Sequence, residues 1–187
     1  MKKAVFLDKD GTLIPDIPYN VIPEKITLHE SAAEGLRKLQ AAGFLFIVIS
    51  NQSGVARSLF EESALQSVEE KLSDLLEKIG VSLTGFYYCP HHPDGSHPDY
   101  SHACDCRKPQ PGMLQKAAVE QSIDLAKSWM IGDILHDVEA GNRAGCKTVL
   151  IDNGGETEWL SGPFRTPTFT VANLDEAADA ILEMERG

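Results

Sequence analysis

Short apolar, β-rich runs alternate with helix-like stretches along this chain, and this alternation constrains the fold more than any other feature. Strands that are each followed by a helix are joined by crossovers, and such crossovers build a parallel sheet. We therefore predict an α/β fold, a doubly wound, Rossmann-like parallel sheet with helices on both faces and the first strand near its centre. The predicted strands are residues 4–7, 44–49, 85–88, 129–131, 148–151 and, more weakly, 168–171, and the predicted helices are 31–42, 61–79, 112–121, 136–144 and 174–185.

The length and composition suit one such unit. A chain of 187 residues with 42% hydrophobic and 24% charged residues is typical of a globular protein, so we expect a single domain over residues 1–187. No apolar stretch reaches the roughly 18 residues of a membrane span, and the first residues lack a signal peptide's apolar region, which predicts the cytoplasm. The net charge of −11 argues against general nucleic-acid binding. No apolar stripe is left unassigned, which favours a monomer.

Two carboxylates, Asp8 and Asp10, directly follow the first predicted strand. Open α/β sheets bind ligands at the carboxyl ends of their strands. With Gly11 freeing the backbone to turn, acids at this spacing suit a nucleophile, a second acid and a divalent cation. Aspartate and glycine are also ordinary turn residues, so a polar turn is the alternative interpretation.

A second polar loop follows predicted strand 44–49. Its hydroxyl, amide and backbone N–H groups would form a neutral cradle for phosphate oxygens. The alternative is a polar loop that caps a helix. Arg57, a few residues later, would either reach a second anionic group or lie solvated at the surface. The candidate phosphate- and substrate-contacting residues of this loop are Ser50, Asn51, Gln52 and Ser53.

A third acid, Asp133, follows predicted strand 129–131. A hard oxygen ligand at this strand end would complete a Mg²⁺ site begun by Asp8. Asp137 lies four residues later and would either support that site or act as a helix-start acid that interacts with the helix dipole. The second role is slightly favoured.

The long insertion at residues 89–108 contains three of the four cysteines and four of the six histidines. A Cys-x-His pair and a Cys-x-Cys pair joined by a loop fit the four ligands of a closed, structural zinc site. A disulfide is the rival interpretation, although it is unusual in a cytosolic protein. The predicted ligands are Cys89, His91, Cys104 and Cys106, with His92, His97 and His102 as competitors for the histidine position.

The zinc ligands lie directly before Arg107 and Lys108, so a metal here would fix the direction in which two cations point. Together with the strand-end acids, these groups suit phosphoryl transfer through a covalent aspartyl phosphate. Asp8 would attack phosphorus, while Asp10 would protonate the leaving oxygen and later deprotonate water. Lys108 and Ser50 would hold the remaining phosphoryl oxygens. A zinc-organised, non-catalytic binding module is the remote alternative.

The ordered set of motifs resembles the haloacid dehalogenase superfamily of phosphatases. Within that superfamily, residues 50–57, 87–93 and 104–109 look most similar to heptose bisphosphate phosphatases. Histidinol-phosphate phosphatases and broader sugar phosphatases are the alternatives, and the 12 residues between His91 and Cys104 favour the heptose group. The matching motifs are Asp8-x-Asp10-Gly11-Thr12, Ser50-Asn51, Lys108-Pro109 and Gly132-Asp133-x-x-x-Asp137.

The resemblance implies removal of the 7-phosphate of D-glycero-D-manno-heptose 1,7-bisphosphate, a step toward the nucleotide-activated heptose of lipopolysaccharide. It also implies a fold without a large cap domain. It also implies Mg²⁺ held by Asp8, the backbone carbonyl of Asp10 and Asp133. Ile134 departs from the pattern, because some heptose enzymes carry a lysine there, and this weakens any inference about the anomer. The resemblance further implies Ser50 and Lys108 on the phosphoryl group, Arg107 recognising the substrate, and Asp16 to Tyr19 lining the sugar.

Overall fold

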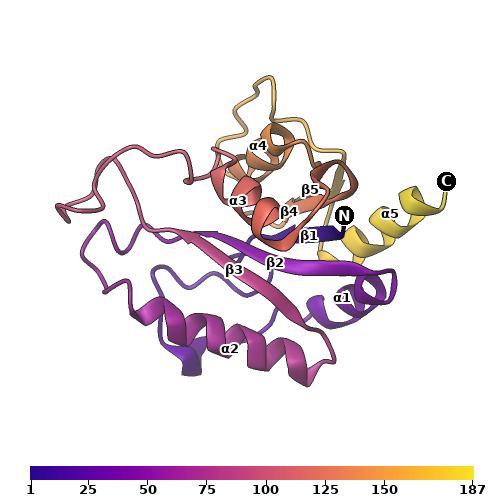
Figure 1. Ribbon diagram of the computed structural model, residues 1–187, viewed down its shortest axis with the longest axis horizontal. Coiled ribbons are helices and arrows are strands. Elements are labelled where there is room, and N and C mark those ends of the chain that lie inside the picture. The colour runs from indigo at the N-terminus through magenta and orange to yellow at the C-terminus, as the bar shows by residue number, and fades with distance from the viewer.

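The computed structural model describes residues 1–187 and contains a six-stranded sheet between two layers of helices (Figure 1). The strand order is β3-β2-β1-β4-β5-β6, and every neighbouring pair is parallel. This confirms the predicted fold class, and β1 lies inside the sheet as expected. The strands are β1 Lys3–Leu7, β2 Phe44–Asn51, β3 Leu83–Cys89, β4 Trp129–Gly132, β5 Lys147–Ile151 and β6 Phe169–Val171.

Helices cover both faces of the sheet, because the central strands are apolar on both sides. In β1, Val5 and Leu7 pack into one core cluster, whereas Ala4 and Phe6 pack into another. Helices α1, α2 and α5 contribute to the first cluster, and α3 and α4 contribute to the second. The helices are α1 Ala32–Ala41, α2 Ala64–Lys78, α3 Gly112–Gln121, α4 Leu135–Ala144 and α5 Leu174–Arg186, with 3₁₀ turns at Pro23–Lys25 and Leu125–Lys127.

Several element boundaries differ from the sequence prediction by one to three residues, and two of these differences have a visible cause. Helix α2 begins at Ala64 rather than at residue 61, and the preceding Glu62 instead accepts hydrogen bonds from Tyr88 and Tyr100. Strand β3 extends back to Leu83, which pairs with Phe46 beside an irregularity in the register. Both differences depend on tertiary contacts that local patterns do not reveal.

The register of the sheet brings the functional loops together. Leu7 at the end of β1 is opposite Val48 of β2 and Ile131 of β4, so the chain leaves these three strands at one edge. The insertion after β3 forms a long loop beside this edge (Figure 1). None of the helices is both long enough and apolar enough to cross a membrane.

Candidate active site

Asp8 occupies the first position after β1, where its backbone N–H donates to the carbonyl of Ile131 at 2.9 Å. The following turn requires Gly11, which has a φ of +84°. A Cβ atom at Gly11 would lie 2.2 Å from Oδ2 of Asp133. The glycine therefore lets the chain turn and also lets it pass close to the third predicted acid.

Three buried carboxylates form the centre of the site. One side-chain oxygen from each of Asp8, Asp133 and Asp137 lies within 4.8 Å of the other two. Burial, reinforced by the charge of Asp8, raises the pKa of both Asp133 and Asp137. Crowded buried carboxylates are unfavourable unless a cation compensates them, and hard oxygen donors are the ligands that Mg²⁺ prefers. The donor set therefore fits a divalent cation.

Lys108 supplies the protein's own cation to this cluster. Its buried Nζ lies 2.7 Å from Oδ1 of Asp8, 2.7 Å from Oδ1 of Asp137 and 2.9 Å from the carbonyl oxygen of Ile49. Burial opposes its charge, but Asp137 and Asp8 outweigh that effect and raise the pKa of Lys108. The lysine is thus held in its charged form beside Asp8.

The backbone of Lys108 is fixed by Asn51. The Asn51 amide donates to the Lys108 carbonyl at 3.1 Å, and the Lys108 N–H donates to the Asn51 side-chain oxygen at 3.0 Å. Asn51 is a predicted substrate contact, and in this pairing its side-chain oxygen and one N–H of its amide are engaged. Its side chain therefore connects the loop after β2 to the loop that carries Lys108.

Asp10 lies beside a buried lysine. Lys9 is almost completely buried, and its Nζ donates to Oδ1 of Asp10 at 2.7 Å. Burial raises the pKa of Asp10, while the neighbouring Lys9 opposes that rise. An acid with a raised pKa that remains partly exposed is suited to exchanging a proton with a bound molecule.

A polar cavity of about 260 Å³ opens next to Asp10. It receives side chains from the loop after β1 and from the loop after β2. Ser50 is buried, does not line the cavity, and accepts a hydrogen bond from Gln52 at 2.7 Å. The sequence-predicted residues that line the cavity together with Asp10 are Asp16, Tyr19, Asn51, Gln52 and Ser53.

Arg57 and Arg107 do not line that cavity but form a separate cationic pair around His92. Arg57 Nη2 lies 3.2 Å from Nε2 of His92, and burial together with the Arg107 and Arg57 charges lowers the pKa of His92. Nε of Arg57 and Nη1 of Arg107 are buried without a hydrogen-bond partner. Unpaired guanidinium donors of this kind are suited to an anionic ligand.

The insertion gathers Cys89, His91, Cys104 and Cys106, whose ligand atoms lie within 4.8 Å of one another. Cys89 Sγ is 3.5 Å from Cys104 Sγ, and His91 Nδ1 is 3.3 Å from Cys106 Sγ. Tetrahedral zinc places its ligands roughly 3.5–3.8 Å apart, close to these separations, although Cys89 Sγ and Cys106 Sγ lie only 2.8 Å apart. Three thiols and one imidazole nitrogen form a donor set that fits zinc. Contact with Cys89 lowers the pKa of the Cys106 thiol to about 5, which favours the thiolate that a metal requires.

The other histidines of the insertion have different roles. His92 contacts Arg57, and its Nδ1 accepts from the N–H of Asp94 at 3.0 Å. His97 accepts from the N–H of Asp99 at 3.2 Å. His102 packs its ring against His91 with the ring centroids 4.4 Å apart. Only His91 points a ring nitrogen into the cysteine cluster.

Sequence reasoning missed the loop that follows β5. Asn153 donates to the Gly11 carbonyl at 2.8 Å and accepts from the N–H of Gly155 at 3.1 Å. A Cβ atom at Gly155 would lie 2.1 Å from Oδ2 of Asp133, so this loop packs directly against the acid cluster. The rule that identified the other strand ends applies equally to residues 152–155, which follow predicted strand 148–151.

Sequence reasoning also undervalued Asp137 and overlooked Lys9. Asp137 does act at the start of α4, where its Oδ2 accepts from the Ile134 N–H at 3.3 Å. Its other oxygen pairs with Lys108, so the helix-start role and the role at the site are both real. Lys9 carried no signal in the sequence, because a lysine between two acids is usually solvated.

Comparison with known proteins agrees with this geometry. The family description HAD-hyrolase-like matches residues 105–177. A protein of Haemophilus ducreyi named D-glycero-beta-D-manno-heptose-1,7-bisphosphate 7-phosphatase is 45% identical over 162 residues, which cover 86% of this chain and 88% of the relative. The chain belongs to the haloacid dehalogenase superfamily.

Solved structures of phosphatases in this superfamily have the same fold as this chain. A crystal structure of a HAD-like phosphatase from Mesorhizobium loti superposes with a TM-score of 0.83 at 32% identity, covering 98% of this chain and 87% of that one. The D,D-heptose 1,7-bisphosphate phosphatase of B. bronchiseptica, complexed with magnesium and phosphate, superposes with a TM-score of 0.77 at 29% identity, covering 97% and 99%. The superfamily assigned from the motifs is therefore confirmed.

Proposed function

We propose that this protein is a Mg²⁺-dependent phosphatase that removes the 7-phosphate of D-glycero-β-D-manno-heptose 1,7-bisphosphate. The observation that carries the proposal is the position of Asp8, which lies at the sheet edge with Lys108 on its carboxylate and Asp10 beside the adjoining cavity. The name of the 45% identical relative supports the choice of substrate and of the β anomer. The product would enter the synthesis of nucleotide-activated heptose.

The first chemical step uses Asp8 as the nucleophile. An Asp8 oxygen forms a bond to phosphorus in line with the departing sugar oxygen, and the bond between phosphorus and that oxygen breaks. Asp10 gives its proton to the leaving oxygen, for which its raised pKa is suitable. Lys108 and the Ser50 hydroxyl donate to the other phosphoryl oxygens as their negative charge redistributes.

The second step returns Asp8 to its free form. Asp10, now a carboxylate, takes a proton from water while the water oxygen bonds to phosphorus and the aspartyl bond breaks. The products are heptose 1-phosphate, with a free hydroxyl at carbon 7, and inorganic phosphate. When Mg²⁺ is bound by Asp8, Asp133 and the backbone carbonyl of Asp10, it neutralises negative charge between the nucleophile and the phosphoryl group.

The substrate's remaining groups have matching partners. Asp16 and Tyr19 line the cavity beside Asp10, where the hydroxyl groups of a sugar would lie. The unpaired donors of Arg57 and Arg107 would bind the phosphate that is not removed. Zinc bound by the four residues of the insertion would hold Arg107 and Lys108 in place.

The test is phosphate release with Mg²⁺ from the α and β anomers of the heptose bisphosphate and from histidinol phosphate, measured side by side. We expect kcat/KM for the β anomer to exceed that for histidinol phosphate by about 100-fold, or about 2.7 kcal/mol. A preference for histidinol phosphate would overturn the proposed substrate but leave the chemistry intact. No release from any of the three would overturn both.

A further inference from the structure

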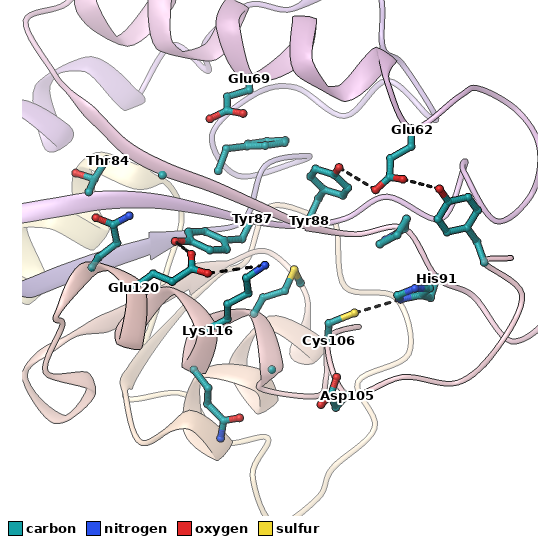
Figure 2. Close-up of a pocket in the computed structure, with 18 residues that line it drawn as sticks. Glu62, Glu69, Thr84, Tyr87, Tyr88, His91, Asp105, Cys106, Lys116 and Glu120 are labelled. Carbon is teal, nitrogen blue, oxygen red and sulfur yellow. Dashed lines mark hydrogen bonds and ion pairs between the residues drawn. The ribbon is translucent and has the colours of Figure 1, made fainter.

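A groove of about 850 Å³ runs along the outer edge of β3 (Figure 2) and is distinct from the cavity at Asp10. No residue lines both. Glu62 and Glu69 come from the side of α2, Lys116 and Glu120 come from α3, and β3 lies between them. The groove is therefore a channel whose floor is a strand edge and whose walls are two helices.

The edge of β3 has no neighbouring strand, because β3 is the last strand on its side of the sheet. Residues 83–88 are all partly buried and none of them is fully enclosed. Natural sheets protect such edges with lysine, proline, inward-pointing charges or bulges on the outer side. The strand sequence LTGFYYC contains no charged residue and no proline. This edge is both open and rich in residues that favour strand pairing.

The two tyrosines of β3 are tied to the walls of the groove. Tyr87 donates its hydroxyl to Glu120 of α3 at 2.7 Å, and Tyr88 donates to Glu62 at 2.9 Å (Figure 2). The two rings lie on opposite faces of the strand, as the alternation of side chains requires. Each tyrosine hydroxyl is thus anchored to its own wall.

The walls are strongly acidic. Glu62, Glu69, Asp105 and Glu120 line the groove, and Lys116 is its only lysine or arginine. A second copy of this chain, which carries a net charge of −11, would place equally acidic walls against these. A positively charged segment would instead be attracted and would not meet like charges.

We propose that the β3 edge binds an extended, positively charged segment of a partner protein, which pairs with β3 as an additional strand. Main-chain hydrogen bonds would supply affinity, and the acidic walls would select lysine and arginine side chains. One end of the groove is formed by His91 and Cys106 of the cysteine-histidine cluster. A bound segment would therefore contact the loop that positions Arg107 and Lys108.

The first test uses a fluorescein-labelled peptide of alternating lysine and valine as long as β3, which has 7 residues. We expect saturable binding in fluorescence anisotropy and slower amide hydrogen exchange in residues 83–89. A matched peptide with proline at its centre keeps the charge but loses a backbone donor, and we expect it to bind about tenfold more weakly. Equal binding of the proline peptide, equal binding of a glutamate–valine peptide, or unchanged exchange in β3 would overturn the proposal.

The second test exchanges charges on α2. Glu69→Lys places a cation in the groove, whereas Glu70→Lys makes the same change on the neighbouring exposed residue outside the lining. We expect Glu69→Lys to weaken binding of the lysine–valine peptide about fivefold and Glu70→Lys to weaken it less than about twofold. Phosphate release should be unchanged in both variants. Equal effects of the two variants would contradict the role of the groove. A dimer in light scattering that protects residues 83–89 without peptide would make a second copy the occupant and overturn the proposal.

Discussion

The two clusters of candidate metal ligands in this protein are assembled in opposite ways. Cys89 and Cys106 are only 17 positions apart, and all four residues of their cluster lie in β3 and the loop that follows it. Asp8 and Asp133, by contrast, follow strands that are far apart in the sequence and meet only because β1 and β4 are paired. The ligands of the first cluster are brought together by one short segment and a bound metal, whereas those of the second are brought together by the pairing of strands in the sheet.

The acid cluster has a direct role in the proposed chemistry, whereas the cysteine cluster has an indirect one. The cysteine cluster touches no group at the acid cluster, but the Arg107 N–H donates to Cys104 Sγ at 3.3 Å, and Lys108 is the next residue. Lys108 then contacts Asp8. Changes at the acid cluster should therefore act on chemistry, and changes at the cysteine cluster should act first on stability.

Asp8→Asn is the most severe change expected at the acid cluster. It removes the attacking charge with almost no change in volume, and kcat should fall on the order of 10⁴-fold or more. The midpoint of urea unfolding should stay the same or rise, because one of three crowded carboxylates has been neutralised. Substantial turnover in this variant would exclude the covalent mechanism.

Lys108→Met should lower both activity and stability. The substitution leaves Asp8 and Asp137 buried without their cation, which should reduce kcat by about 10²–10³-fold. We expect the free energy of unfolding to fall by roughly 3 kcal/mol. Lys116→Met, which alters an exposed lysine of α3, is the control and should change kcat little. Similar losses in the two variants would argue against a specific role for Lys108.

Cys104→Ser changes the cysteine-histidine cluster and should lower stability more directly than it lowers activity. The variant should lose bound zinc and melt at a lower temperature, and kcat/KM should fall by about tenfold because Arg107 and Lys108 are less well positioned. Zinc content by elemental analysis, melting temperature and kcat/KM are measured on the same sample. Cys146→Ala, which changes the cysteine outside the cluster, should retain zinc. Full stability and activity in Cys104→Ser would separate the cluster from catalysis.

Gly155→Ala gives the smallest expected effect and tests how closely the β5 loop approaches Asp133. The added methyl group would meet Oδ2 of Asp133 at 2.1 Å, so Mg²⁺ binding measured by calorimetry should weaken by about tenfold. Gly162→Ala lies in the same connection and meets only the flexible Arg165 side chain, so it should bind Mg²⁺ normally. Normal binding by both variants would show that this loop does not position the acid.

The sequence predicted those features that depend on strand ends or on ligands closely spaced along the chain. Alternating patterns predicted the parallel sheet, and the strand-end rule then predicted that Asp8 and Asp133 would lie close together. The features that it missed depend on how distant segments approach each other. Gly155 matters only because its loop returns to Asp133, and the groove at β3 exists only because no strand pairs there. Lys9 is buried because other segments pack around it, and its charged side chain alone would predict a solvated residue.

The most direct measurement is to mix the enzyme with Mg²⁺ and the β-anomeric heptose bisphosphate, quench with acid within one turnover, and digest for mass spectrometry. We expect the peptide that contains Asp8 to gain the mass of one phosphoryl group, and we expect Asp8→Asn to show no gain. Phosphate release from native enzyme with no phosphorylated Asp8 peptide at any quench time, together with turnover in Asp8→Asn, would contradict the assignment of Asp8 as the nucleophile.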